Sequence, residues 1–181
     1  MKHMIFLICF IALFLSTAQA QHKDFISKQH RISASIPDGW DQIQGIRDNT
    51  VLKLARSGKA GQKARIAVVL DNIPNGRIEP GFDIWNMSDD DIRKAIESGA
   101  MRGETVTMID VGRASIDGIH VVWNKNRRSI PDSTLWEFVY EGIRGSQYLT
   151  IRLTSVGNKD WFDLNQSIFA EFIKSLRLNM R

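Results

Sequence analysis

Residues 32–40 read ISASIPDGW, and the fold can be worked out from this stretch toward both ends of the chain. Its first five residues alternate between apolar and polar side chains, as a β-strand with one buried face does. Pro37-Asp38-Gly39 then combines a fixed φ angle with a permissive glycine, which is typical of a tight turn. Trp40 follows directly. We therefore expect a half-buried strand, a turn, and a large aromatic side chain that closes one end of a sheet–helix core.

On the N-terminal side, residues 22–31 are polar and predict a loosely held lead-in. Residues 1–20 have the three parts of a secretory signal, namely a positive Lys2, an apolar run over 5–15 and small residues that end at Ala20. The apolar run is shorter than the roughly 20 residues that span a bilayer, which disfavours the alternative of an uncleaved membrane anchor. The sequence predicts cleavage between Ala20 and Gln21. The mature protein is then a single domain, residues 21–181, that is periplasmic or secreted.

The composition limits the class of protein and the kinds of chemistry that this chain can carry out. The chain has 181 residues, is 43% hydrophobic and 24% charged, and has a formal net charge of +4. These values suit one folded domain and exclude disordered, collagen-like and disulfide-framework chains. Its single cysteine, Cys9, lies in the leader, so the mature domain has neither disulfides nor thiol chemistry. The net charge is too small to indicate a class of partner.

Beyond Trp40, apolar strand-like segments alternate with polar loops. Residues 51–56 and 65–70 are expected to be strands joined by a polar, glycine-containing hairpin loop over 57–63. Residues 71–87 show no clean period and form the longest irregular stretch. Four more strands are expected at residues 105–111, 119–125, 135–142 and 148–154, with turns at Asp117-Gly118 and within 142–146.

Two helices are expected. The first follows Ser88, whose hydroxyl can cap it; residues 89–91 place three aspartates in its first turn, and Gly103 lies just past its end. The second is capped by Asp160 and has apolar residues at helical spacing from there to residue 176. The order of strands, helix, strands and helix, with hairpin links, is typical of an α+β fold with a mainly antiparallel sheet flanked by helices.

These features resemble the Mog1/PsbP-like superfamily. The segment 32–40 is similar to the opening I-x-x-P-x-G-W of that family, and a strand hairpin, a helix, and a strand meander with Gly118 at a turn follow in the same order. The resemblance covers residues 25–178 and ends in a closing helix that contains Phe169, Phe172, Ile173, Ser175 and Leu176. It implies an α/β/α sandwich used mostly for binding, as in photosystem extrinsic subunits, a Ran-binding protein and bacterial envelope or secretion-adaptor proteins. No ligand motif is shared, so no role of a residue carries over.

The catalytic and metal-binding motifs that we tested are not present in the sequence. Residues 58–63 lack the spacing and the hydroxyl of a phosphate-binding loop and indicate a basic hairpin tip. The three aspartates at 89–91 are consecutive, whereas a calcium loop needs ligands at alternate positions. His120 opens an expected strand, where a semi-buried structural histidine is the simpler interpretation. We therefore predict no catalytic residue, no cofactor and no metal, although a hydrolase site can still assemble in space from distant residues.

Two segments are candidates for contact with a partner. Phe82 and Trp85 lie in the irregular stretch, where apolar side chains either fold back onto the core or form an exposed patch. Lys125, Arg127 and Arg128 form a basic cluster that either binds an anionic partner or lipid headgroups or is a solvated strand end. An exported protein with few interleaved aromatic residues is a poor candidate for nucleic-acid binding.

The leading hypothesis is an exported, non-enzymatic binding or accessory domain of the bacterial cell envelope. It would contact a protein partner through the two candidate segments. One alternative is a small periplasmic hydrolase in which acidic residues or His120 converge in a cleft. Another is a small-ligand carrier with a cavity between sheet and helix.

Overall fold

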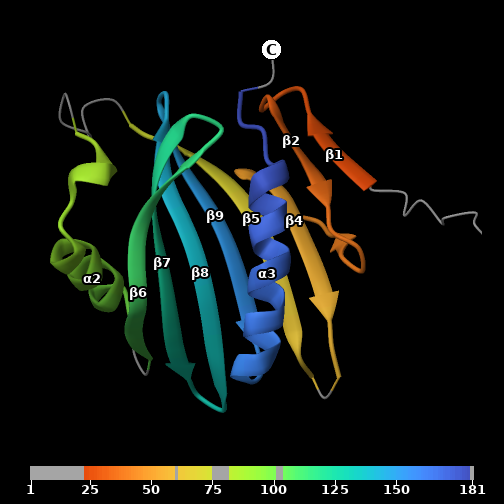
Figure 1. The fold of residues 1–181 in the computed structure, drawn as a ribbon, viewed down its shortest axis with the longest axis vertical. Helices are drawn as coiled ribbons and strands as arrows, with labels where there is room; N and C mark the ends of the chain where they lie inside the picture. Colours follow the sequence, from red (N-terminus) through yellow and green to blue (C-terminus); the bar gives the residue numbers. More distant parts are fainter. Residues whose placement is uncertain (1–22, 60, 75–81, 101–103, 180–181) are drawn as a thin grey trace, which may run out of the picture.

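The computed structural model describes residues 23–59, 61–74, 82–100 and 104–179. The expected signal peptide, its cleavage site and Gly103 lie outside these ranges. The main element is a seven-stranded antiparallel sheet in the order β3-β4-β5-β9-β8-β7-β6 (Figure 1). In chain order the elements are β1 (Lys23–Ser27), β2 (Ile32–Ile36), β3 (Asp41–Gln42), β4 (Thr50–Ser57), β5 (Lys63–Asn72), the 3₁₀ helix η1 (Ile84–Asn86), α2 (Asp89–Ser98), β6 (Thr105–Ile116), β7 (Ile119–Ile130), β8 (Ser133–Arg144), β9 (Gln147–Val156) and α3 (Lys159–Ser175).

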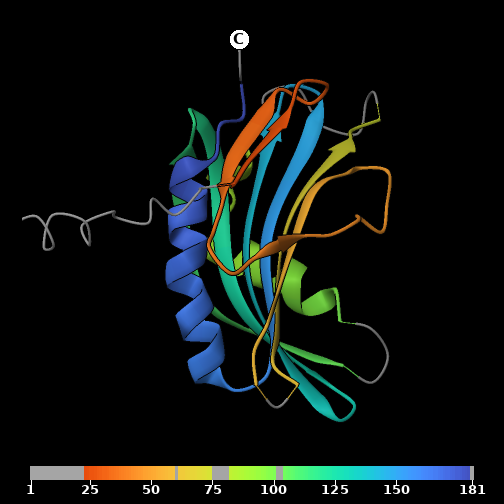
Figure 2. The same cartoon turned by 90° about the vertical axis from the view of Figure 1, so that its right-hand side faces the viewer.

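The sheet lies between two helices, as Figure 2 shows from the side. Adjacent residues of a strand point to opposite faces of a sheet, and in β7 they join two separate hydrophobic clusters. Val121 belongs to the main cluster, together with Phe169 and Phe172 of α3. Val122 belongs to a smaller cluster with Ile92 of α2. The expected α+β class, with a mainly antiparallel sheet flanked by helices, is therefore confirmed. None of the helices in the described ranges is long and apolar enough to cross a membrane.

The turn after β2 forms as expected. The Trp40 N–H donates a hydrogen bond to the Pro37 carbonyl over 3.1 Å, and Gly39 has a φ of 73°, which favours glycine. Trp40 is 2% exposed and belongs to the main cluster. The aromatic residue that follows the turn therefore lies in the core.

The polar lead-in contains a strand that the sequence pattern did not predict. β1 pairs antiparallel with β2, from Lys23 opposite Ile36 to Ser27 opposite Ile32. The prediction of a loose lead-in was wrong over β1, because ladder hydrogen bonds with β2 hold a segment whose own side chains are mostly polar and exposed. β2 is in turn joined to the C-terminal segment by two backbone hydrogen bonds between Ser33 and Arg177, of 3.0 and 2.8 Å.

Of the two helix caps predicted from the sequence, one was confirmed and one was wrong. Ser88 caps α2 as expected, since its hydroxyl accepts from the Asp91 N–H over 3.1 Å. The expected cap at Asp160 was wrong, because Asn158 accepts from the Trp161 N–H over 3.0 Å and places Asp160 in the first turn of α3.

The hairpin turns were predicted more accurately than the strand ends. Asp117 and Gly118 both have positive φ, 49° and 79°, and join β6 to β7 as expected. The Asp117 carboxylate also accepts hydrogen bonds from the backbone N–H groups of Leu178 and Asn179, which ties the C-terminal segment to this turn. The turn expected within 142–146 is narrower, because β8 continues to Arg144.

Candidate functional site

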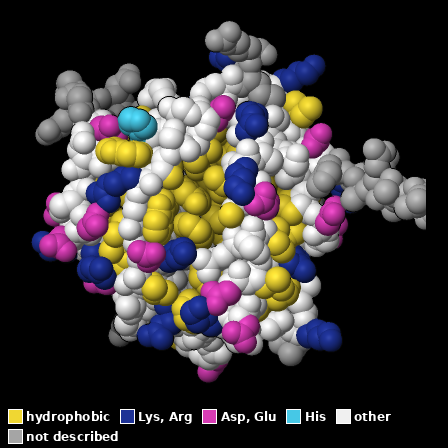
Figure 3. Space-filling model, viewed as in Figure 1, with side chains coloured by type: hydrophobic (Ala, Val, Ile, Leu, Met, Phe, Trp, Pro, Cys, Tyr) yellow, Lys and Arg dark blue, Asp and Glu magenta, His cyan; other side chains and the backbone are white. Residues whose placement is uncertain are grey.

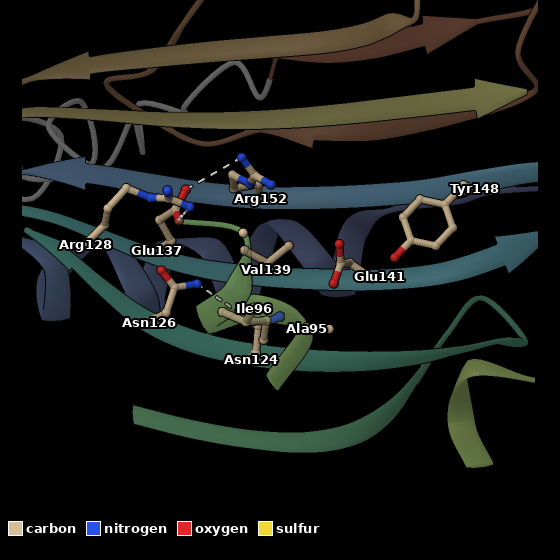
Figure 4. A pocket seen from close by; sticks show the side chains of 11 residues that line it. Ala95, Ile96, Asn124, Asn126, Arg128, Glu137, Val139, Glu141, Tyr148 and Arg152 are labelled. Carbon is tan, nitrogen blue, oxygen red and sulfur yellow. Dashed lines mark hydrogen bonds and ion pairs between the residues drawn. The ribbon is translucent and has the colours of Figure 1, made fainter. Parts of the chain in front are cut away.

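A polar pocket of about 350 Å³ lies between α2 and the sheet face that α2 partly covers (Figure 4). The helix contributes a wall of small and apolar residues near its C-terminal end. Three neighbouring strands contribute the remaining lining, which is mostly polar. The lining residues are Ala95, Ile96 and Gly99 beside α2, Asn124, Asn126 and Arg128 of β7, Glu137, Val139 and Glu141 of β8, and Tyr148 and Arg152 of β9.

Strand register brings these polar side chains together. Asn126 is paired with Glu137 across β7 and β8, and Val139 is paired with Arg152 across β8 and β9. Directly paired residues share a face, so the polar side chains form a continuous patch on the α2 side. The sequence carries a signal for this in residues 136–141, WEFVYE, where aromatic residues toward α3 alternate mainly with acidic residues toward α2. A strand polar on one face and aromatic on the other indicates two different environments.

Glu137 is the most buried charged group of the pocket, with its side chain 5% exposed. Its carboxylate lies 3.7 Å from the Arg128 guanidinium and 3.6 Å from that of Arg152. Arg128 also binds Glu104 over 2.6 Å. A buried carboxylate needs such partners, because leaving water without them is costly. Figure 4 shows Glu137 between the two arginines.

Two asparagines lie beside this ion-pair network. Asn126 Nδ2 donates to Asn124 Oδ1 over 3.1 Å, and both side chains are buried. Asn126 is 3% exposed, and its Oδ1 has no hydrogen-bond partner in the described part of the chain. Buried polar atoms are almost always paired, so an orphaned acceptor in a pocket wall is notable.

The other end of the pocket holds Glu141 and Tyr148, whose side chains lie near each other (Figure 4). Burial raises the pKa of the Glu141 carboxyl above its ordinary value, while Arg152 and the Tyr148 hydroxyl partly oppose the rise. Burial and the neighbouring Glu141 also raise the pKa of the Tyr148 hydroxyl. Tyr148 therefore stays a neutral phenol beside the Glu141 carboxyl group.

The residues that the sequence singled out do not form one surface. Lys125 and Arg127 project on the α3 side of β7, whereas Arg128 projects on the α2 side and lines the pocket, because successive strand residues alternate. Lys125 Nζ lies 4.9 Å from the centre of the Phe138 ring and 5.7 Å from that of Trp123. We predicted these three basic residues to form one cluster because the sequence alone did not show which face of the sheet each side chain would occupy.

The second predicted segment lies at η1. Phe82 is 46% exposed, whereas Ile84 is buried, so this apolar stretch is partly folded onto the protein. Trp85 packs on His120 with ring centres 4.5 Å apart. Phe82 and His120 line a second pocket of about 430 Å³ at the β6–β7 turn.

His120 is also the residue on which a hydrolase would depend. Its Nδ1 lies 3.7 Å from an Asp83 carboxylate oxygen, and the imidazole is mostly exposed. The described lining of this pocket contains no serine, threonine, cysteine or tyrosine to act as a nucleophile. The described part of the chain also shows no group of three histidine, cysteine or acidic side chains able to hold a metal ion.

A third feature lies on the α3 side of the sheet. Trp123, Trp136 and Tyr140, here called the aromatic face, are partly buried residues packed against the main cluster. α3 packs mainly on β9 and β2 and also touches β5 and β8, and hydrophobic side chains gather beside it in the space-filling view (Figure 3). The Trp123 indole crosses Gly112 of β6, where a Cβ atom would come within 2.5 Å of the ring.

No family model matches the chain, and no curated protein matches it by sequence. Solved structures with the same fold are found. The cyanobacterial PsbP (CyanoP) of Synechocystis sp. PCC 6803 is 12% identical, with a TM-score of 0.59 over 90% of this chain and 95% of that one. LpqN of Mycobacterium tuberculosis, involved in cell envelope biogenesis, is 10% identical, with a TM-score of 0.54 over 90% and 87%. The Saccharomyces cerevisiae Ran-binding protein Mog1p is 9% identical, with a TM-score of 0.53 over 87% and 95%.

Identities this low show likeness of fold alone. The similarity covers most of this chain and most of each compared chain, so it concerns the whole domain rather than one shared motif. The chain therefore has a Mog1/PsbP-like fold, as the resemblance over residues 25–178 implied.

Proposed function

We propose that this chain, with its Mog1/PsbP-like fold, is an exported, non-enzymatic accessory domain of the bacterial cell envelope that binds a protein partner. The observation that carries the proposal is the aromatic face, where partly buried rings remain accessible beside α3. Similarity of fold to LpqN, a protein involved in cell envelope biogenesis, supports the envelope assignment.

The composition of the aromatic face suits a protein partner. Trp, Tyr and Arg are enriched in protein interfaces and dominate their binding energy. Lys125 and Arg127 lie on the same side of β7 as Trp123, so the rings have a basic border. The complementary partner is a polypeptide surface with apolar side chains flanked by acidic ones. Phe82 and Trp85 remain a second candidate contact, on the other side of the sheet.

The partner prediction is tested with the double variant Trp123→Ala/Lys125→Glu. It removes the central ring and reverses one border charge. Recovery of a cross-linked envelope protein with the tagged chain is expected to fall at least about tenfold, because loss of a hot-spot side chain costs about 2 kcal/mol or more. Quantitative mass spectrometry after cross-linking in the producing cells provides the measurement.

Two matched variants make the result interpretable. Glu171→Gln, on exposed α3 surface, is expected to leave recovery unchanged, and Phe82→Ala/Trp85→Ala tests the second candidate contact. Thermal unfolding of each variant checks that the fold persists. Equal recovery with the aromatic-face variant would assign the contact elsewhere. Absence of any cross-linked protein with the native chain would contradict the accessory role.

Export is tested separately by expressing the full chain with a C-terminal tag. The mature protein is expected to begin at Gln21, because the small residues before it fit the signal-peptidase pattern. N-terminal sequencing and intact mass after cell fractionation give the answer. Replacing Ala18 and Ala20 together with bulky leucines should leave the precursor uncut. A native chain that keeps its first twenty residues and stays in the cytoplasm would refute export.

A further inference from the structure

The polar pocket beneath α2 contains hydrogen-bond acceptors that no donor among the described residues satisfies. Asn126 Oδ1 is buried and unpartnered in the described part of the chain. Glu141 lies near Tyr148 and Arg152, but no hydrogen bond or ion pair joins its carboxyl group to another of the described residues. Arg128 and Arg152 are both engaged by Glu137. The pocket therefore lacks a hydrogen-bond donor for Asn126 Oδ1 and a cation beside Glu141.

The arrangement of charges around the pocket also favours a cationic ligand. Glu137 engages both guanidinium groups that line the pocket, those of Arg128 and Arg152, so neither forms an ion pair with Glu141 within 4 Å. The C-terminal end of α2 also borders the pocket through Ile96 and Gly99, and the last turn of α2 has no basic residue. A helix C-terminus carries partial negative charge and favours a cation.

We propose that this pocket binds a small amine, with its ammonium group at Glu141 and a second hydrogen-bond donor at Asn126. Glu141 lies four residues along β8 from Glu137, the partner of Asn126, so the two positions are roughly 13 Å apart at about 3.3 Å per residue. This separation favours an elongated ligand such as a polyamine. A volume of about 350 Å³ is at the small end for ligand sites.

The walls suit such a ligand. The Tyr148 ring offers an aromatic face, to which an ammonium group is attracted. Val139, Ala95 and Ile96 provide apolar contact for the methylene chain between the two donors. The site is on the α2 side of the sheet, opposite the aromatic face, so it does not depend on the proposed partner surface.

Titration of the isotope-labelled mature chain, residues 21–181, with spermidine and the longer diamine 1,8-diaminooctane tests the proposal. Both are expected to shift the side-chain amide resonances of Asn124 and Asn126 and the backbone resonance of Gly99 in a saturable manner. 1,8-Octanediol, which matches the diamine in length but lacks its positive charges, is expected to cause no such shifts. A second arm uses Nα-acetyl-lysine N-methylamide, and tighter binding of this probe than of the free amines would identify the source as a lysine side chain of a polypeptide.

Glu141→Gln supplies the decisive variant, because it keeps the shape and removes the charge. Affinity for spermidine is expected to fall at least about tenfold, since hydrogen bonds to charged groups contribute more than neutral ones. Glu171→Gln, which removes an exposed carboxylate on α3, is the matched control and should bind as the native chain does. Unchanged affinity in Glu141→Gln overturns the proposal. So does the absence of shifts in the native chain up to about 10 mM amine, which corresponds to affinity too weak for a specific site.

Discussion

Replacing Trp40 with alanine is expected to lower the free energy of unfolding by about 3–5 kcal/mol, the range for removing a buried aromatic side chain. Trp40 is 2% exposed and belongs to the main cluster between the sheet and α3. The turn before it holds the backbone in place, so the surrounding structure cannot easily close the cavity. Equilibrium urea unfolding of the mature chain measures the change.

Two controls separate burial from the chemistry of the ring. Trp40→Phe should be clearly milder than Trp40→Ala, because the Trp40 indole Nε1 has no hydrogen-bond partner in the described part of the chain and only volume is lost. Phe82→Ala removes a ring that is 46% exposed and should change stability by no more than about 1 kcal/mol. If Trp40→Ala costs no more than Phe82→Ala, Trp40 does not close the core.

Replacing Glu137 with glutamine is expected to destabilise the protein by about 2–3 kcal/mol. The value lies below the roughly 3–5 kcal/mol of a fully buried broken ion pair because Arg152 is 45% exposed and Arg128 keeps Glu104. The loss arises because Arg128, which is mostly buried, would then face an uncharged amide in place of a carboxylate. Urea unfolding again provides the measurement.

The matched comparison for Glu137→Gln is Glu171→Gln. Glu171 also pairs with a basic residue, Lys174, but both side chains are 71% exposed. Exposed pairs contribute about 0–1 kcal/mol, so this variant should be close to native. Equal effects of the two substitutions would show that the ion pairs of Glu137 do not stabilise the fold.

Much of the fold follows from signals within a few residues. The alternation of β2, the hydroxyl of Ser88 before a helix and the Asp117-Gly118 turn all act locally, and all three predictions were confirmed. β1 was missed because its strand is held by its partner rather than by its own pattern. The cap of α3 is Asn158 and not the predicted Asp160; both residue types cap helices well, and only the backbone path selects between them.

Much less of the candidate site could be predicted from the sequence. Lys125, Arg127 and Arg128 are close along the chain, yet the strand sends Arg128 into the pocket and the other two to the opposite face. Glu137 and Arg152 are distant in the sequence, and only the register between β8 and β9 brings them together. The alternation in residues 136–141 is a signal for a polar face that the predicted strand at 135–142 left unused, and it does not tell what that face meets.

By itself, the sequence determined the class of fold, the strand–turn–tryptophan segment at 32–40 and most helix and strand positions. These depend on periodicity, turn residues and capping, which each act within a few residues. Only the tertiary structure decided that Glu137 lies between two arginines, that Asn126 keeps an unused acceptor in a pocket wall, and that the rings of the aromatic face stand beside α3. Such features depend on strand register and on which part of each sheet face a helix covers, and both are set by contacts between residues far apart in the chain.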